Sequence, residues 1–379
     1  MPPLLYLFCL VNLVVGTGAF VMGGILGPVA AGLGSTVPAV GQAMTAYALA
    51  TAVLAPVLLV VTGAWSRKQV MLLAMALFAA GNVLCALAPS LPWLLAGRVV
   101  MGMGAVFTPV AAGLAVAAVP MARRGKALSL VFLGMSLSYV IGVPLGAWVA
   151  AHHDWHAPFW VVAALAMLMG LLLAALVPQA APAPAASFAG VGAALRNPAV
   201  RRTLLLTLLY FTAIFTVFSY IGPVLQALVP MSTARLSITL AAFGLSGVAG
   251  TLLGGWANDR FGSLPTLRAH LAVLAAMMAA VPLCQGHYGA MLLVFIVWGV
   301  AGFGLMPAQQ SMLTALAPPH AALLLSLNAS MLYLGTALGA VVGGAATGLV
   351  GPARLAWAAL PFALLAAWLL RPGPEHLRP

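Results

Sequence analysis

The chain has 379 residues, of which 64% are hydrophobic and 5% are charged. A soluble domain carries roughly a quarter charged residues, so this composition excludes a water-exposed globular surface and predicts an integral protein of the lipid bilayer. The net charge of +12 does not indicate nucleic acid as a partner, because the basic residues are scattered between apolar runs rather than gathered on one face.

Twelve apolar runs follow one another along the chain, separated by Pro, Gly, charged or polar clusters. They cover residues 4–30, 41–62, 69–88, 92–118, 126–150, 157–178, 203–229, 236–256, 268–284, 288–311, 322–347 and 353–371. An α-helix needs about twenty apolar residues to cross a bilayer core. The first run is too long for a cleavable signal, so we expect it to be retained. The sequence therefore predicts an all-α membrane protein with twelve transmembrane helices.

The basic residues fall mainly in alternate loops. With a cytoplasmic N-terminus, only Arg235 and Arg354 lie in outer loops. The inner set consists of Arg67, Lys68, Arg123, Arg124, Lys126, Arg196, Arg201, Arg202, Arg260, Arg268, Arg371 and Arg378. Since positive residues favour cytoplasmic loops, we predict that both termini are cytoplasmic and that the protein is a multi-pass component of a bacterial inner (plasma) membrane.

A Pro/Ala-rich stretch opens the longest interruption, at residues 179–202. Six runs lie on each side, and the second half echoes the first. Glycines at 102 and 104 recur at 302 and 304, and glycines at 142 and 146 recur at 339 and 343. Several transporter folds are built from such repeats, with the substrate site between the halves. We predict six-helix bundles at 1–178 and 203–379, joined by a cytoplasmic linker at 179–202.

The loop after the eighth run contains a G-x-x-x-D-R-x-G string made of Gly255, Asp259, Arg260 and Gly262. An acid at a helix end can pair with a basic residue or a helix N-terminus, so this loop is a candidate for an inward gate. An ordinary polar turn is the alternative.

The corresponding loop of the first half has Arg67 where the string has its acid, followed by Lys68. These two residues are expected to anchor the topology, so the gate would rest mainly on the second half.

Arg98 is the only charge well inside an apolar run. A charge is costly in the bilayer, which makes Arg98 a candidate for proton coupling. The alternative is a structural arginine that extends outward to loop carbonyls.

The fifth run contains Gly142, Pro144 and Gly146. Glycines four apart permit close helix packing, and the proline frees a carbonyl so that the helix bends. Ordinary packing explains the two glycines equally well.

Polar and aromatic side chains within the runs are candidates for a substrate cavity. They are Asn12, Tyr47, Tyr139, Tyr210, Phe211, Phe215, Trp298, Gln309, Asn328 and Tyr333. Aromatic rings with a few amides suit a flat, mostly neutral small molecule. Helix packing is the alternative for each residue taken singly.

The outer loop at 152–156 reads His-His-Asp-Trp-His, which offers metal ligands. An interfacial cap with an aromatic anchor fits it better. We therefore expect no metal and no cofactor, and the absence of a nucleophile–base pair or a phosphate loop argues against an enzyme.

Three motifs resemble signatures of the major facilitator superfamily. They are the string of residues 255–262, the arginine and glycines of 98–104, and the Gly/Pro motif of 142–146. Residues 32–49, 131–134 and 325–330 are similar to the arabinose-efflux-permease-like group of its drug:proton antiporters. This resemblance implies the major facilitator fold and export of sugars, nucleobases or drugs. In proton-coupled members, the arginine corresponding to Arg98 is associated with proton transfer.

The chain departs from similar permeases in its coupling groups. Ala19 stands where they often carry an acid, and Asp154, Asp259 and Glu375, the only three acids, lie outside the apolar runs. No histidine lies deep in a run either. Arg98-centred coupling, protons carried by the substrate and uncoupled diffusion all remain open.

We therefore predict a monomeric secondary transporter that exports a small neutral or weakly ionised organic molecule by alternating access, with protons as the candidate coupling ion. The rivals are an importer of a small organic anion that uses Arg98, an uncoupled facilitator, and a receptor or assembly factor on the same scaffold.

Overall fold

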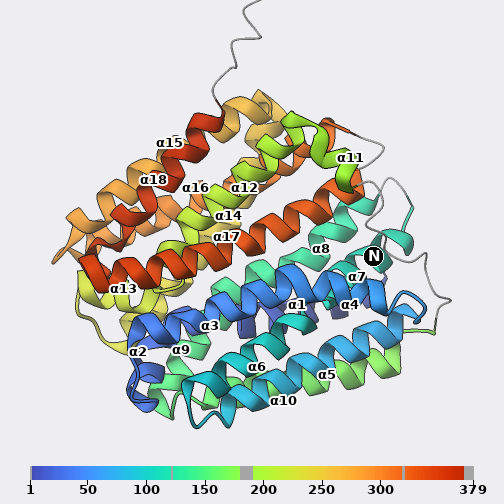
Figure 1. Ribbon diagram of the computed structural model, residues 1–379, viewed down its shortest axis with the longest axis horizontal. Coiled ribbons are helices and arrows are strands. Elements are labelled where there is room, and N and C mark those ends of the chain that lie inside the picture. The colour runs from blue at the N-terminus through green and yellow to red at the C-terminus, as the bar shows by residue number, and fades with distance from the viewer. Residues whose placement is uncertain (1, 121–122, 180–190, 318–320, 371–379) are drawn as a thin grey trace, which may run out of the picture. The chain divides into compact units, whose positions relative to one another are not determined.

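The computed structural model describes residues 2–120, 123–179, 191–317 and 321–370, and the regular secondary structure in these ranges is helical (Figure 1). Twelve helical segments within them are long and apolar enough to cross a membrane. The prediction of an all-α protein with twelve spans is confirmed.

The first six apolar runs form ten α-helices, because several runs are interrupted. The helices are α1 (Pro3–Phe20), α2 (Met22–Gly32), α3 (Val37–Leu49), α4 (Ala55–Val61), α5 (Arg67–Ala86), α6 (Leu91–Gly104), α7 (Phe107–Ala117), α8 (Arg124–Leu137), α9 (Val143–His152) and α10 (Ala157–Leu176). The first run divides at Val21, where α1 ends and α2 begins.

The described residues of the rest of the chain form eight α-helices. They are α11 (Val191–Arg196), α12 (Pro198–Phe218), α13 (Ile221–Leu228), α14 (Thr233–Phe261), α15 (Ser263–Ala280), α16 (Tyr288–Ala315), α17 (Ala321–Val350) and α18 (Leu355–Leu369), with short 3₁₀ turns at η4 (Val281–Cys284) and η6 (Pro352–Arg354). Residues 180–190 of the predicted linker 179–202 lie outside the described residues.

The chain divides into two compact units. The first unit comprises Met1–Phe188, Ser219–Gln226 and Pro230–Gly244, and the second comprises Ala189–Phe218, Ala227–Val229 and Leu245–Pro379. Within the first unit, α1 packs against α8 and α10, and α5 packs against α6 and α10 (Figure 1). Within the second, α12 packs against α17 and α18, and α15 packs against α16 and α18. The unit boundary passes through α14, which the six-plus-six division did not anticipate.

Two π-helical turns interrupt spans of the first unit, and each ends two residues before a proline. They are η1 (Ala50–Leu54), followed by Pro56, and η3 (Ser138–Gly142), followed by Pro144. Proline has no backbone N–H, and its ring crowds the carbonyl four residues earlier. Widening the preceding turn relieves this crowding, which explains why both irregular turns lie there.

Candidate functional site

Arg98 is fully buried in the first unit and is surrounded by backbone carbonyls. Its Nη1 and Nη2 donate to the carbonyls of Gly18 and Ala19, each at 2.7 Å, and its Nε donates to the carbonyl of Ala43 at 3.1 Å. The guanidinium also lies 4.8 Å from the centroid of the Tyr47 ring. The side chain thus joins α6 to α1 and α3 instead of extending outward to a loop.

The end of α1 explains why these carbonyls need a donor. The last carbonyls of a helix have no N–H partner within it, and Gly18 and Ala19 belong to the last turn of α1 before Val21. Arg98 supplies the missing donors. Because its donors are engaged and a guanidinium keeps its proton, these contacts support an anchoring role for Arg98 more than a proton-transfer role.

A buried amide joins three helices of the first unit. Asn12 on α1 donates to the carbonyl of Val131 on α8 at 3.0 Å and accepts from Thr108 on α7 at 2.7 Å. Both polar groups of the Asn12 amide are therefore used inside the unit. Asn12 was predicted to line a cavity, and its hydrogen bonds support a helix-locking role instead.

The second unit has a related cluster on the corresponding spans. Asn328 on α17 accepts from Thr207 on α12 at 2.7 Å and from Gln309 on α16 at 2.9 Å, and Gln309 also donates to the carbonyl of Thr203 at 3.3 Å. The Oε1 atom of Gln309 is buried and has no hydrogen-bond partner within the described residues. The amide oxygen of Gln309 is thus an unused acceptor, whereas the amide oxygen of Asn12 already accepts from Thr108.

Helix α12 of the second unit carries a row of aromatic side chains. The Tyr210 and Phe211 rings lie 4.8 Å apart, and Phe211 stacks on Phe215 at 5.8 Å. Tyr210 is buried, and its hydroxyl has no hydrogen-bond partner in the described part of the chain. Trp298 on α16 is also buried, and Tyr333 on α17 is half-buried.

The first unit contributes fewer of the predicted cavity residues. The Tyr47 hydroxyl is buried without a hydrogen-bond partner among the described residues, although its ring meets Arg98. Tyr139 is half-buried and stacks on Phe20, with the ring centroids 4.8 Å apart.

The predicted bend motif lies against α1. A Cβ on Gly142 would lie 2.8 Å from the Cβ of Thr17 and closer still to its hydroxyl, and one on Gly146 would collide with Val21. Pro144 is buried at the start of α9. The glycines therefore permit close packing of the fifth span on the first, while the proline accompanies the π turn.

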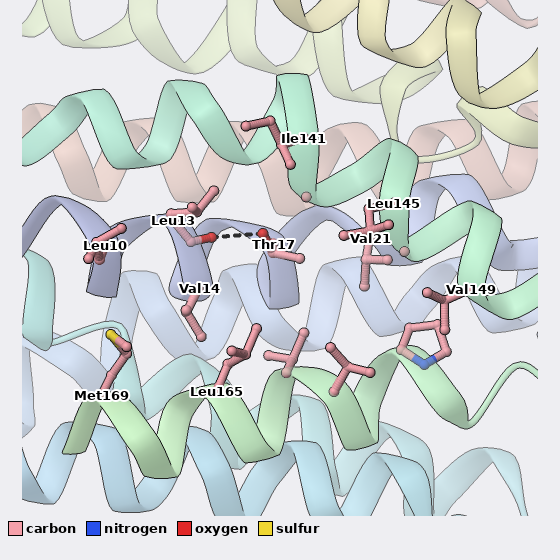
Figure 2. A pocket seen from close by; sticks show the side chains of 15 residues that line it. Leu10, Leu13, Val14, Thr17, Val21, Ile141, Leu145, Val149, Leu165 and Met169 are labelled. Atoms are coloured by element: carbon pink, nitrogen blue, oxygen red, sulfur yellow. Dashed lines mark hydrogen bonds between the residues drawn. The ribbon is translucent and has the colours of Figure 1, made fainter. Parts of the chain in front are cut away.

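These glycines also border an apolar pocket of about 210 Å³ between α1, α9 and α10, which Figure 2 shows from close by. Thr17 carries the only side-chain hydroxyl among its lining residues, and this hydroxyl donates to the carbonyl of Leu13 at 2.7 Å. The pocket therefore offers no free polar group that would orient a polar substrate.

The predicted gate loop forms a tight turn between α14 and α15. Gly262 has a φ of +85°, a conformation that glycine adopts without strain. Asn258 accepts from the hydroxyl of Ser263 at 2.8 Å and donates to the Asp259 carboxylate at 3.4 Å. Asp259 and Arg260 are exposed, and Gly255 is half-buried. Gly262 thus has a clear structural role, while the gate role of Asp259 stays a prediction.

The corresponding loop of the first half caps helices. Ser66 and Gln69 form a reciprocal cap at the start of α5, and Lys68 donates to the carbonyl of Ala174 near the end of α10 at 2.6 Å. A cation there complements the negative end of the helix dipole. Arg67 is half-buried at the first position of α5.

The histidine-rich outer loop contacts the ends of helices. The Asp154 carboxylate accepts from the backbone N–H groups of His156 and Ala157 at 2.8 and 2.9 Å. His156 Nδ1 lies 3.2 Å from the carbonyl of Ala86. Trp155 is buried against Gly32. These contacts favour the interfacial-cap interpretation.

The threonine partners of the amides and the depth of one histidine were not predicted from the sequence. Thr108, Thr203 and Thr207 look like ordinary polar residues of apolar runs, and only their helix partners reveal them. His270 was placed at the edge of a span that starts at residue 268, whereas α15 begins at Ser263, seven residues before it. Pro265 is the signal that could have found this start, because proline is tolerated in the first turn of a helix.

These features define a class of protein: a multi-pass α-helical membrane protein whose corresponding spans carry related buried polar clusters. The model of the Major Facilitator Superfamily matches residues 8–239 and 230–379. The chain therefore belongs to the Major Facilitator Superfamily and is a membrane transporter of that family.

Bacterial relatives match nearly the whole chain. The inner membrane transport protein YdhP of Escherichia coli (strain K12) is 31% identical over 333 residues, covering 87% of this chain and 85% of YdhP. The uncharacterized MFS-type transporter YbcL of Bacillus subtilis (strain 168) is 29% identical over 354 residues, covering 93% of this chain and 91% of YbcL.

Solved structures show the same fold at low sequence identity. A bacterial homologue of the human lysosomal transporter Spinster, inward-facing and occupied, has a TM-score of 0.79 at 18% identity and covers 97% of this chain and 95% of its own. The xylose transporter XylE of E. coli, in a partially occluded inward-open conformation, has a TM-score of 0.75 at 16% identity and covers 98% of both chains.

Proposed function

We propose that the protein is a secondary transporter of a bacterial inner membrane that exports a small neutral or weakly ionised organic molecule by alternating access. The observation that carries the proposal is the polar and aromatic set of the second unit. Tyr210 Oη and Gln309 Oε1 are buried without partners within the described residues. The Tyr210 ring lies next to Phe211, which stacks on Phe215. An orphaned buried polar atom is costly, so a substrate that hydrogen-bonds to it recovers that cost.

The chemistry of this set favours a neutral, flat substrate. It offers a hydroxyl and an amide oxygen but no charged side chain, and aromatic faces favour planar apolar surfaces. Sugars, nucleobases and phenicol drugs are the classes to test. The rival that imports an organic anion through Arg98 is less favoured, because the Arg98 donors are already engaged by three carbonyls.

The proposed orientation places both termini in the cytoplasm, so that the turn at Gly262 faces inward. In this arrangement Asp259 and Arg260 belong to the inward gate. The support is the charge asymmetry of the loops together with the exposure of both side chains next to a tight turn.

Solute counterflow in proteoliposomes tests the substrate class. The purified protein is screened with labelled arabinose, adenine and chloramphenicol, with and without a pH gradient. The variant Tyr210→Phe removes one buried hydroxyl and is expected to raise the KM of the transported compound by about tenfold, equivalent to about 1.4 kcal/mol. Tyr6→Phe is the matched control, since Tyr6 is 55% exposed on α1.

The screen has clear contrary outcomes. Failure of a folded sample to exchange any of the three compounds contradicts the substrate assignment. Equal KM values for native protein and Tyr210→Phe contradict the role given to the second-unit hydroxyl. Failure of an imposed pH gradient to drive net accumulation of a compound that does exchange would identify an uncoupled facilitator.

A further inference from the structure

A second pocket of the first unit carries two cations. It has a volume of about 230 Å³ and lies where α1, α5 and α7 meet the segment that follows α10. Arg67 and Lys68, the first two residues of α5, are its charged lining residues, and both are half-buried. The other lining residues are apolar or small, namely Leu4, Leu114, Ala117, Ala118, Val177 and Pro178. Pockets for drug-sized ligands measure about 300–1,000 Å³, so this one suits a smaller group.

The pocket lies at the level of the membrane interface, because helix ends form it. Leu4 stands at the start of α1, Arg67 at the start of α5 and Ala117 at the end of α7. These helices belong to three different spanning segments. A spanning helix begins and ends near the lipid headgroups. The walls of the pocket are therefore next to headgroups at one surface of the bilayer, whichever surface that is.

No carboxylate of the first unit can balance this pair of cations. The only acid of the unit is Asp154, which precedes α10, whereas the pocket residues Val177 and Pro178 follow α10. The 20 residues of α10 rise about 30 Å. That separation is several times the Debye length of about 8 Å at physiological ionic strength. The counter-charge of the pocket has to come from outside the unit.

The start of α5 adds to the positive potential. The first N–H groups of a helix form the positive end of its dipole, where an acid is favourable and a cation is not. Ser66 and Gln69 cap this end without adding a charge, and the first turn carries no acid. The Lys68 ammonium has three donors, and the carbonyl of Ala174 accepts one of them at 2.6 Å. The pocket thus combines positive charge with N–H donors, which suits an anion.

Other loops of the chain show that this arrangement is more than a topology anchor. In the corresponding turn of the second half, Asp259 directly precedes Arg260, so that the two charges offset each other. Arg123 and Lys126, the described cations between the fourth and fifth spans, are exposed. A topology signal needs only positive charge in a loop. The half-burial of Arg67 and its neighbour against apolar walls is an additional feature that points to a ligand.

We propose that this pocket binds the phosphate of an anionic phospholipid, with Arg67 and Lys68 as the phosphate contacts. Basic pockets between the ends of spanning helices suit anionic headgroups. Guanidinium and ammonium groups form strong charge-assisted hydrogen bonds with phosphate oxygens, and partial burial reduces screening by salt.

The apolar walls select a lipid over a free phosphate ion. Leu4, Leu114 and Val177 offer apolar surface to the glycerol and the first acyl carbons, which inorganic phosphate lacks. Phosphatidylglycerol carries a net negative charge, whereas the choline group of phosphatidylcholine offsets its phosphate. The pocket should therefore prefer phosphatidylglycerol to phosphatidylcholine.

The test uses delipidated protein in detergent and needs no transported substrate. Dioleoyl phosphatidylglycerol, dioleoyl phosphatidylcholine and inorganic phosphate are titrated separately, and bound lipid is counted by native mass spectrometry. The first variant combines Arg67→Gln with Lys68→Gln. The matched control combines Arg123→Gln with Lys126→Gln, which removes the same charge from exposed side chains of the same unit. Ala118→Phe narrows the pocket while keeping both cations, and it tests the site even if the first variant does not fold.

We expect the native protein and the Arg123/Lys126 control to bind phosphatidylglycerol about tenfold more tightly than phosphatidylcholine. The Arg67/Lys68 variant is expected to bind phosphatidylglycerol about tenfold more weakly than the native protein, because each basic residue near an anionic headgroup contributes to the affinity. Ala118→Phe is expected to weaken this binding by a similar factor. Inorganic phosphate is expected not to displace the lipid at equal concentration.

Native affinity in either the Arg67/Lys68 variant or Ala118→Phe would overturn the proposal, as would an equal loss in the Arg123/Lys126 control. Equal affinities for the two lipids, or displacement of the lipid by equimolar inorganic phosphate, would overturn the assignment of an anionic lipid. Failure of every compound in the counterflow screen would contradict the proposed function alone, because lipid binding is measured without transport.

Discussion

The most informative single substitution is Arg98→Met, which keeps a long side chain and removes the charge and its donors. In the native protein the guanidinium donates to the carbonyls of Gly18, Ala19 and Ala43, and all of its surface is buried. A methionine leaves these three carbonyls without that partner in an apolar environment.

The cost follows from the number of acceptors. A buried acceptor that loses its donor costs about 1–3 kcal/mol, and the loss of one guanidinium shared by three carbonyls is expected to cost about 3–5 kcal/mol in total. In larger domains, each kcal/mol of lost stability lowers the melting temperature by roughly 2 °C. The melting temperature of Arg98→Met should therefore fall by about 5–10 °C. Arg98→Lys keeps the charge but has a different donor geometry, so we expect an intermediate loss.

The assay is thermal unfolding in detergent, followed by intrinsic tryptophan fluorescence, together with counterflow at two pH values. If Arg98 anchors the junction of α1 and α2, Arg98→Met melts earlier and Arg98→Lys retains the native pH dependence of transport. An unchanged melting temperature together with a selective loss of pH-driven transport in Arg98→Met would refute the anchoring role and restore Arg98 as the coupling residue.

Three further outcomes are expected. Gly142→Ala should destabilise the protein by about 1–3 kcal/mol in detergent unfolding, because the added methyl group meets Thr17. Gly27→Ala is the control and should not, since a Cβ at Gly27 has no neighbour within 4 Å. Equal melting temperatures of the two variants would contradict the packing argument. Gly262→Ala and Gly262→Asn should each cost about 1–3 kcal/mol, because the φ of +85° and ψ of 165° at this residue lie in a region that is essentially restricted to glycine, and native stability of either variant would contradict this account of the turn. Asp259→Asn should slow counterflow without lowering the melting temperature, since its carboxylate is exposed; unchanged rates would remove Asp259 from the gate.

The spans could be predicted from the sequence because a bilayer imposes a minimum apolar length on every helix. The twelve runs correspond to the twelve spanning segments. The irregular turns at Ser138–Gly142 and Ala50–Leu54 were only partly signalled, by the prolines that follow them. The division at Val21 was not predicted, although Gly18 and Gly23 lie within three residues of it.

The side-chain roles were harder to predict, because they depend on contacts between distant parts of the chain. The partners of Arg98 are backbone carbonyls, which every residue has, so no sequence motif identifies them. Asn12 and Asn328 both read as cavity residues, yet each is held by a threonine from another span. His270 was overlooked because the start of α15 was placed at residue 268 instead of Ser263.

The direction of transport is the most direct test of the central claim that the protein is an exporter. The compound identified by counterflow is presented to inside-out and right-side-out membrane vesicles of cells that produce the native protein, under an imposed pH gradient that is acidic on the periplasmic side of the membrane. An exporter accumulates the compound in inside-out vesicles above the level in vesicles without the protein, and collapse of the gradient abolishes the difference. Gradient-driven accumulation in right-side-out vesicles alone would contradict the account and identify an importer.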